Sequence, residues 1–146
     1  MPEIIEKKSI GEALARKLIR GAYEEADKIG IPMAIAVCDE NGLLKTFIRM
    51  DGAPYMSNEV AINKAKTAAS FGMPTHEWYD AIKSDPGLTL GAPHITDFVT
   101  FGGGFPIVVD GQTAGGIGVS GGSVAEDMRC AEAAITLLSG GRATVE

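Results

Sequence analysis

Three charged residues near the middle of the chain are of types that could act together on a small acid. Arg49 and Asp51 flank the end of a predicted strand, and Lys64 follows in the next predicted helix. In one interpretation Arg49 binds a carboxylate or propionate, while Lys64 and Asp51 share proton transfer or polarisation at a carbonyl or imine. In the other, the three charges form a structural salt bridge. The sequence leaves both interpretations open.

A turn rich in glycine and serine precedes the last predicted helix and is the second candidate site. Ser120, Gly121, Gly122 and Ser123 would present hydroxyls, unpaired backbone amides and the positive end of the helix dipole to a carboxylate or phosphate. The alternative is that the glycines only let the strand and the helix pack closely.

Two familiar patterns overlap this turn, and each lacks its context. Residues 116–121 match GxGxxG, but too few residues follow for the next parallel strand of a dinucleotide fold. Residues 118–122 match GxSxG, but both histidines precede Ser120, whereas in an α/β-hydrolase the histidine follows the nucleophile.

The two histidines, His76 and His94, are the third candidate. Neither belongs to a metal-binding pattern, because His76-Glu77 lacks the second histidine of HExxH, and no dedicated metal site is predicted. Either imidazole could be an axial haem ligand or a general base. A satisfied histidine in a loop or at a helix end is the structural alternative.

The elements that must position these residues follow from apolar spacing and turn residues. Capping boxes are predicted at Ser9/Glu12 and at Ser123/Glu126, and tight turns at Asn41-Gly42 and Asp110-Gly111. The predicted order is a helix over 9–29, strands over 33–38 and 43–50, helices over 57–70 and 75–83, an ordered loop over 84–94, strands over 94–101, 106–109 and 113–120, and a final helix after Ser123. This order predicts an α+β fold, with helices packed on a mainly antiparallel sheet of about five strands.

Composition limits the classes of partner. The chain has 146 residues, 13 Lys and Arg against 19 Asp and Glu, and a net charge of −6, which predicts one domain over 1–146 and makes nucleic acid an unfavourable partner. No stretch approaches the about 20 apolar residues of a membrane span, and the first residues do not resemble a signal peptide, so we expect a cytoplasmic protein that does not bind membranes. Cys38 and Cys130 are expected to be buried thiols.

Five segments in order carry a family resemblance: residues 37–44, 49–53, 63–68, 102–107 and 115–122. Together they resemble the GlcG/HbpS-like family of haem-binding (so-called haem-degrading) domains, which also includes OrfY-type proteins and the C-terminal domain of PduO-type cobalamin adenosyltransferases. The resemblance spans about residues 9–139. It implies a profilin-like sandwich, assembly into homo-oligomers, and haem as a possible cofactor.

Three functions are compatible with these residues. The first is an accessory protein that binds a small molecule, haem or a related tetrapyrrole, with Arg49, Lys64 or the 121–123 turn holding the propionates and His76 or His94 near the iron. The second is an enzyme that hydrolyses an imine or tautomerises a small carboxylated intermediate, with Lys64 and either Asp51 or His94 moving protons. The third is an oligomeric scaffold or chaperone. The first two require Arg49 and the amides of the terminal helix to face one hollow.

Overall fold

The computed structural model describes residues 1–141 of the chain. With η marking a 3-10 helix, the elements in chain order are α1 (Glu12–Ile29), β1 (Ala34–Asp39), β2 (Leu44–Arg49), α2 (Ser57–Phe71), η1 (Thr75–Glu77), α3 (Trp78–Ile82), α4 (Pro86–Gly91), η2 (Ala92–His94), β3 (Gly104–Val109), β4 (Gln112–Ser120) and α5 (Val124–Gly141).

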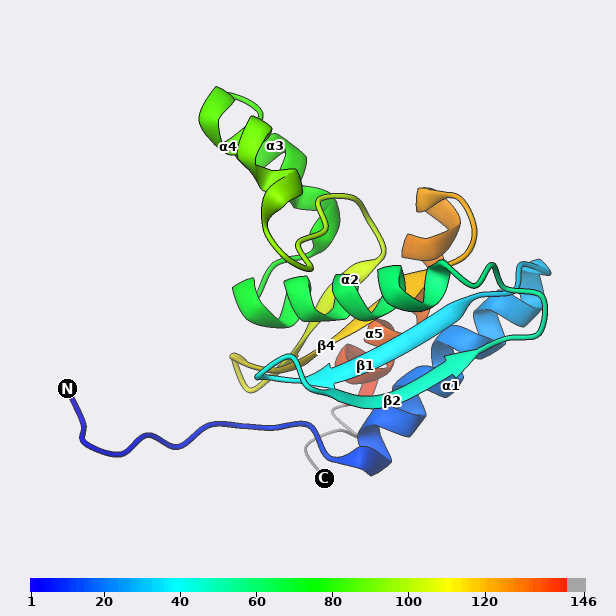
Figure 1. Cartoon of the computed structure of the whole chain (residues 1–146). Coiled ribbons are helices and arrows are strands. Elements are labelled where there is room, and N and C mark those ends of the chain that lie inside the picture. Colours follow the sequence, from blue (N-terminus) through cyan, green and yellow to red (C-terminus); the bar gives the residue numbers. More distant parts are fainter. Residues whose placement is uncertain (142–146) are drawn as a thin grey trace.

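The strands form one antiparallel sheet between two layers of helices. Its order is β2-β1-β4-β3, with α1 and α5 packed on one face and α2 on the other (Figure 1). Residues of β1 alternate between the layers: Ile35 and Val37 join the core beneath α1 and α5, while Ala34, Ala36 and Cys38 face α2. The predicted α+β class with helices on an antiparallel sheet is confirmed.

The sheet has four strands in the described chain, and the fifth predicted strand, over 94–101, is wrong. Residues 92–98 turn back on themselves, because Ile95 N–H donates to Ala92 O and Phe98 N–H donates to Ile95 O. Asp97 also adopts a φ of +64°. These local bonds replace the ladder that a strand would make. The loop predicted over 84–94 instead contains α4, capped by the Asp85 carboxylate.

Some of the predicted helix caps and turns are present in the structure and others are not. The capping box at Ser9/Glu12 is wrong: Gly11 is the N-cap of α1, because Ile10 N–H donates to Ala114 O and keeps the chain before it extended beside β4. The helix predicted over 57–70 is α2, which begins at Ser57 and has no side-chain cap. The turn at residues 110–111 is confirmed, with both residues at positive φ.

Small residues let α2 lie unusually close to the sheet. A Cβ atom on Gly118 would overlap the backbone of Ala61 and Ala65, and one on Gly116 would overlap the backbone of Ala65. The glycines of β4 and the alanines of α2 therefore replace the usual layer of large side chains. Because α2 lies so close to the sheet, the side chain of Lys64 reaches the end of β4, where its amine contacts Val119.

A lobe containing η1, α3, α4 and η2 projects from the sandwich beyond α2 (Figure 1). The rings of Phe71, Trp78 and Phe98 join it to the end of α2, with centroid separations of 4.7, 4.8 and 5.8 Å. Such edge-on contacts stabilise packing beyond the area that they bury. Of the helices that the structure describes, none is both long and apolar enough to cross a bilayer.

Candidate ligand-binding site

A buried ion pair lies where the main elements meet. Lys64 has no exposed surface, and its Nζ donates hydrogen bonds of 2.9 Å to Asp127 Oδ2 and to Val119 O. Asp127 belongs to the first turn of α5, and its Oδ1 accepts a 2.9 Å hydrogen bond from Gly122 N–H. The amine also lies 5.2 Å from the ring centre of Phe101. One pair therefore joins α2, the end of β4 and the start of α5.

The loop over residues 102–104 covers this pair. Gly103 has a φ of +124°, and a Cβ atom there would lie 2.6 Å from Lys64 Nζ and 2.7 Å from Val119 O. The Gly103 carbonyl accepts a 2.9 Å hydrogen bond from Val119 N–H. The backbone of Gly103 therefore packs directly against the Lys64 amine, which it can do only because glycine has no side chain.

Burial dominates the electrostatics of the pair. Desolvation lowers the pKa of Lys64 and raises the pKa of Asp127, while the hydrogen bond between them opposes both shifts. Among described residues, neither Asp51 nor His94 contacts the Lys64 amine, and the carboxylate partner is Asp127 instead. The Lys64 amine has no exposed surface in this conformation, so a substrate could reach it only if the loop over residues 102–104 moved. Proton transfer from Lys64 to a substrate stays a prediction.

The turn that begins α5 uses its amides internally. Ser123 N–H donates to Glu126 Oε1 at 2.8 Å and Glu126 N–H donates to Ser123 Oγ at 3.2 Å, which confirms the capping box. The Gly122 amide is taken by Asp127. A Cβ atom on Gly121 would lie 2.7 Å from Pro32 O, in line with the packing alternative. The chain's own carboxylates therefore occupy the position expected for an external anion, and anion binding by this turn stays a prediction.

Arg49 and Ser120 lie at the same end of the sheet. Ala34 pairs with both of them, so all three side chains leave the face covered by α2, with β1 between the outer two. Two strand spacings, about 10 Å, separate their backbones. Ser120 is buried, whereas Arg49 and Asp51 are exposed. Binding of an acid by Arg49 stays a prediction.

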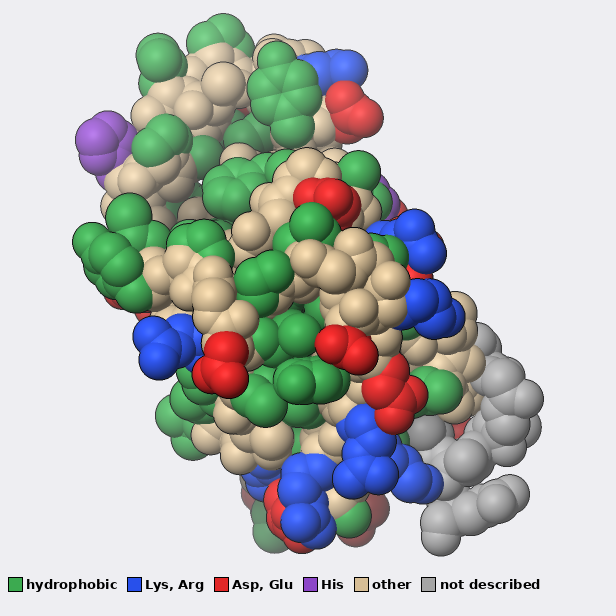
Figure 2. All heavy atoms as spheres, turned by 90° about the vertical axis from the view of Figure 1, so that its right-hand side faces the viewer, with side chains coloured by type: hydrophobic (Ala, Val, Ile, Leu, Met, Phe, Trp, Pro, Cys, Tyr) green, Lys and Arg blue, Asp and Glu red, His purple; other side chains and the backbone are tan. Residues whose placement is uncertain are grey.

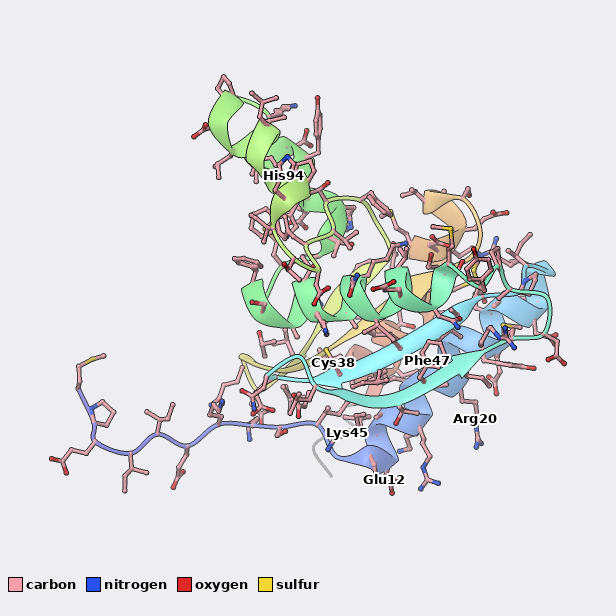
Figure 3. The ribbon with its side chains drawn as sticks, viewed as in Figure 1. Glu12, Arg20, Cys38, Lys45, Phe47 and His94 are labelled. Carbon is pink, nitrogen blue, oxygen red and sulfur yellow. The ribbon has the colours of Figure 1, made fainter. Side chains whose placement is uncertain are left out.

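The two histidines lie in the first and last elements of the projecting lobe. His76 lies in η1, with its ring centre 5.6 Å from that of Phe105 and its Nε2 3.9 Å from the Glu77 carboxylate. His94 ends η2 on the projecting lobe, on the side of α2 away from the sheet (Figure 3). Both residues are exposed. Binding of haem iron by either imidazole stays a prediction.

An open groove lies between α1 and β2. It encloses about 470 Å³ and is lined by Ile19, Ile48 and Tyr23, with Arg16, Arg20 and Glu24 around them. Arg16 binds Glu12, whereas Arg20 forms no ion pair with a described residue and extends outward from α1 (Figure 3). The groove offers an apolar floor, two guanidinium groups and one phenol.

Neither the pairing of Asp127 with Lys64 nor the groove beside α1 was predicted from the sequence. Asp127 lies three residues before Cys130 and four before Ala131, both buried, so the helical spacing alone places a carboxylate on the apolar stripe of α5. That signal could have identified the partner of Lys64. The groove residues of α1 have the spacing of any exposed helix surface, so nothing in the sequence marks them.

The comparisons with known proteins agree with this architecture. A family model described as "Haem degrading protein HbpS-like" matches residues 10–136. The chain belongs to the HbpS-like family. The match confirms the resemblance found in the five sequence segments, and it spans every strand and helix up to the last turns of α5.

Several known proteins are similar to this chain along most of its length. An uncharacterised 15.0 kDa protein of the dhaT-dhaS intergenic region of Citrobacter freundii is 36% identical over 87% of this chain and 90% of its own length. The crystal structure of ORFY from Klebsiella pneumoniae has a TM-score of 0.86 and 30% identity, covering 95% of this chain and 97% of that one. The crystal structure of a PduOC–haem complex has a TM-score of 0.80 and 35% identity, covering 88% of this chain and 94% of that one.

Proposed function

We propose that this protein binds a small molecule, with haem or a related tetrapyrrole as the ligand, and that the groove between α1 and β2 receives it. The observation that carries the proposal is the combination of groups in that groove: an apolar floor bordered by two arginines, a tyrosine and one glutamate. A haem complex of a 35% identical relative supports the class of ligand.

The groups of the groove suit the parts of a tetrapyrrole. Ile19 and Ile48 supply an apolar contact for the ring. The guanidinium group of Arg20 suits one propionate, and Arg16, which pairs with Glu12, would have to exchange that carboxylate for the other. The phenol of Tyr23 is a recognised type of haem-iron ligand. Figure 2 shows hydrophobic side chains in the middle of one side of the molecule, with basic and acidic side chains around them. The local cations matter, because the whole chain carries a net charge of −6.

Haemin titration of the full chain, followed by the Soret band, tests the proposal. We expect saturable binding at micromolar haemin. Arg20→Ala removes a charge-assisted contact of about 1.5–3 kcal/mol and should weaken binding by roughly tenfold or more. Tyr23→Phe should alter the spectrum of the bound iron, while Tyr55→Phe, a matched change on an exposed turn, should leave it unchanged.

The histidine and Arg49 variants decide between sites. If His76→Ala or His94→Ala abolishes the Soret shift and Tyr23→Phe does not, the iron ligand is the histidine predicted from the sequence and the groove assignment is wrong. If Arg49→Ala weakens binding and Arg20→Ala does not, the propionates lie at the other face of the sheet. Absence of any saturable Soret change in the unmodified protein refutes tetrapyrrole binding.

A further inference from the structure

The first residues of the chain form an arm that carries exposed apolar side chains. Ile4 and Ile5 are 85% and 67% exposed, and the segment before Lys7 extends away from the body (Figure 1). Glu3 and Glu6 flank the two isoleucines, and neither forms an ion pair with a described residue. An apolar pair in full contact with water is unfavourable, by about 25 cal/mol for each Å² of apolar surface left uncovered.

The arm is anchored at its base in a direction that takes it away from α1. Ile10 N–H donates to Ala114 O at 2.9 Å, and Lys8 N–H donates to Gln112 Oε1 at 3.3 Å. Lys7 Nζ lies 3.5 Å from the Glu40 carboxylate. These contacts fix residues 7–10 beside the start of β4, so the arm in this conformation does not reach the surface of its own α1.

A second groove has a lining that complements the arm, and it shares Arg20 and Glu24 with the proposed ligand groove. It lies between α1 and α5 and encloses about 300 Å³. Leu14, Leu18 and Leu137 form its apolar lining, and Leu137 is 46% exposed. Its two cationic residues, Lys17 and Arg20, form no ion pair with any residue that the structure describes. The remaining lining residues are Gly21 and Glu24.

The arm and this groove match in charge, polarity and length. The arm presents two carboxylates and two isoleucines, and the groove presents two cations, the carboxylate of Glu24 and three leucines. From Leu14 to Glu24 the helix advances about 15 Å. An extended segment over residues 3–6 spans about 13 Å. Gly21 keeps the floor low, since a Cβ atom there would lie 2.8 Å from the Leu137 side chain.

We propose that residues 3–6 of one copy of this chain dock in the α1–α5 groove of a second copy, with isoleucine on the leucine floor and glutamates toward Lys17 and Arg20. The partner is a second copy because the arm is anchored away from its own groove while its charges complement it. The proposal does not depend on tetrapyrrole binding, and its test needs no ligand.

Disulfide trapping between two single variants tests the contact. Ile5→Cys and Leu14→Cys proteins are purified separately, mixed and oxidised mildly, and the disulfide-linked peptides are identified by mass spectrometry. Cys38 and Cys130 have no exposed surface, so the native thiols do not compete in the folded protein. We expect a peptide joining position 5 to position 14. Leu137→Cys serves as a second acceptor if Leu14→Cys fails to fold.

Two controls test whether the disulfide reports a specific contact between the arm and the groove. Leu90→Cys places an equally reactive thiol on the projecting lobe, where Leu90 is 76% exposed, and should not be trapped by Ile5→Cys. Lys17→Glu with Arg20→Glu in the acceptor should abolish trapping, and Glu3→Lys with Glu6→Lys in the donor should restore it. Trapping no greater than at position 90, or trapping unaffected by the charge reversal, overturns the proposal.

Discussion

Replacing Asp127 by asparagine should destabilise the protein strongly, although the two side chains have nearly the same shape. The substitution leaves Lys64 as a buried cation without its partner, and the side chains of Lys64 and Asp127 are 0% and 5% exposed. Removing one member of a buried pair costs about 3–5 kcal/mol, out of a typical total of about 5–15 kcal/mol. The Val119 carbonyl still accepts a hydrogen bond from the amine, but it supplies no compensating negative charge.

Urea unfolding followed by far-ultraviolet circular dichroism measures this cost. The matched control is Asp97→Asn, because the Lys66–Asp97 pair has a similar length of 3.1 Å but both side chains are 38% exposed. Asparagine tolerates the positive φ of that position, and an exposed pair contributes only about 0–1 kcal/mol.

The double variant Lys64→Met with Asp127→Leu completes the comparison. Removing both charges should recover much of the stability that the single variant loses, because no unpaired ion remains buried. If Asp127→Asn costs no more than Asp97→Asn, the buried pair is not the junction that the structure indicates, and the reasoning is refuted.

Three further predictions concern packing, thiols and the cap of α5. Gly118→Ala places a methyl group against the backbone of α2 and should lower the free energy of unfolding in urea by about 1–3 kcal/mol. Gly91→Ala, where nothing lies within 4 Å, should lower it far less. Equal effects of the two substitutions would contradict the close approach of α2. Burial raises the pKa of Cys38 and of Cys130 from 9.0 to about 11. The free energy of unfolding should therefore fall as pH rises between about 9 and 11, because the thiols ionise first in the unfolded chain. A free energy of unfolding that does not change over this pH range would contradict the burial of the thiols. Neither thiol should react with a disulfide reagent at pH 8 until the chain unfolds. Ser123→Ala should cost about 1 kcal/mol of stability through the lost cap, and an unchanged unfolding midpoint would contradict the geometry of that turn.

The parts of the fold that were predicted correctly depend on short-range chemistry. The turn at Asp110-Gly111 and the capping box at Ser123 each require a few neighbouring residues to adopt a geometry that their own side chains favour. The errors occur where a distant segment competes with that preference. Ser9 had the right neighbours for a cap, but the hydrogen bond from Ile10 to Ala114 extends the chain there.

The same distinction separates the candidate residues. The apolar spacing and turn residues of the chain predicted the α+β class, and the resemblance of five ordered motifs predicted the HbpS-like family. The packing of elements distant in the chain pairs Lys64 with Asp127 rather than Asp51, and it places Arg20 and Tyr23 beside a groove. Charges pair by distance in space, and that distance is set by how closely α2, β4 and α5 pack.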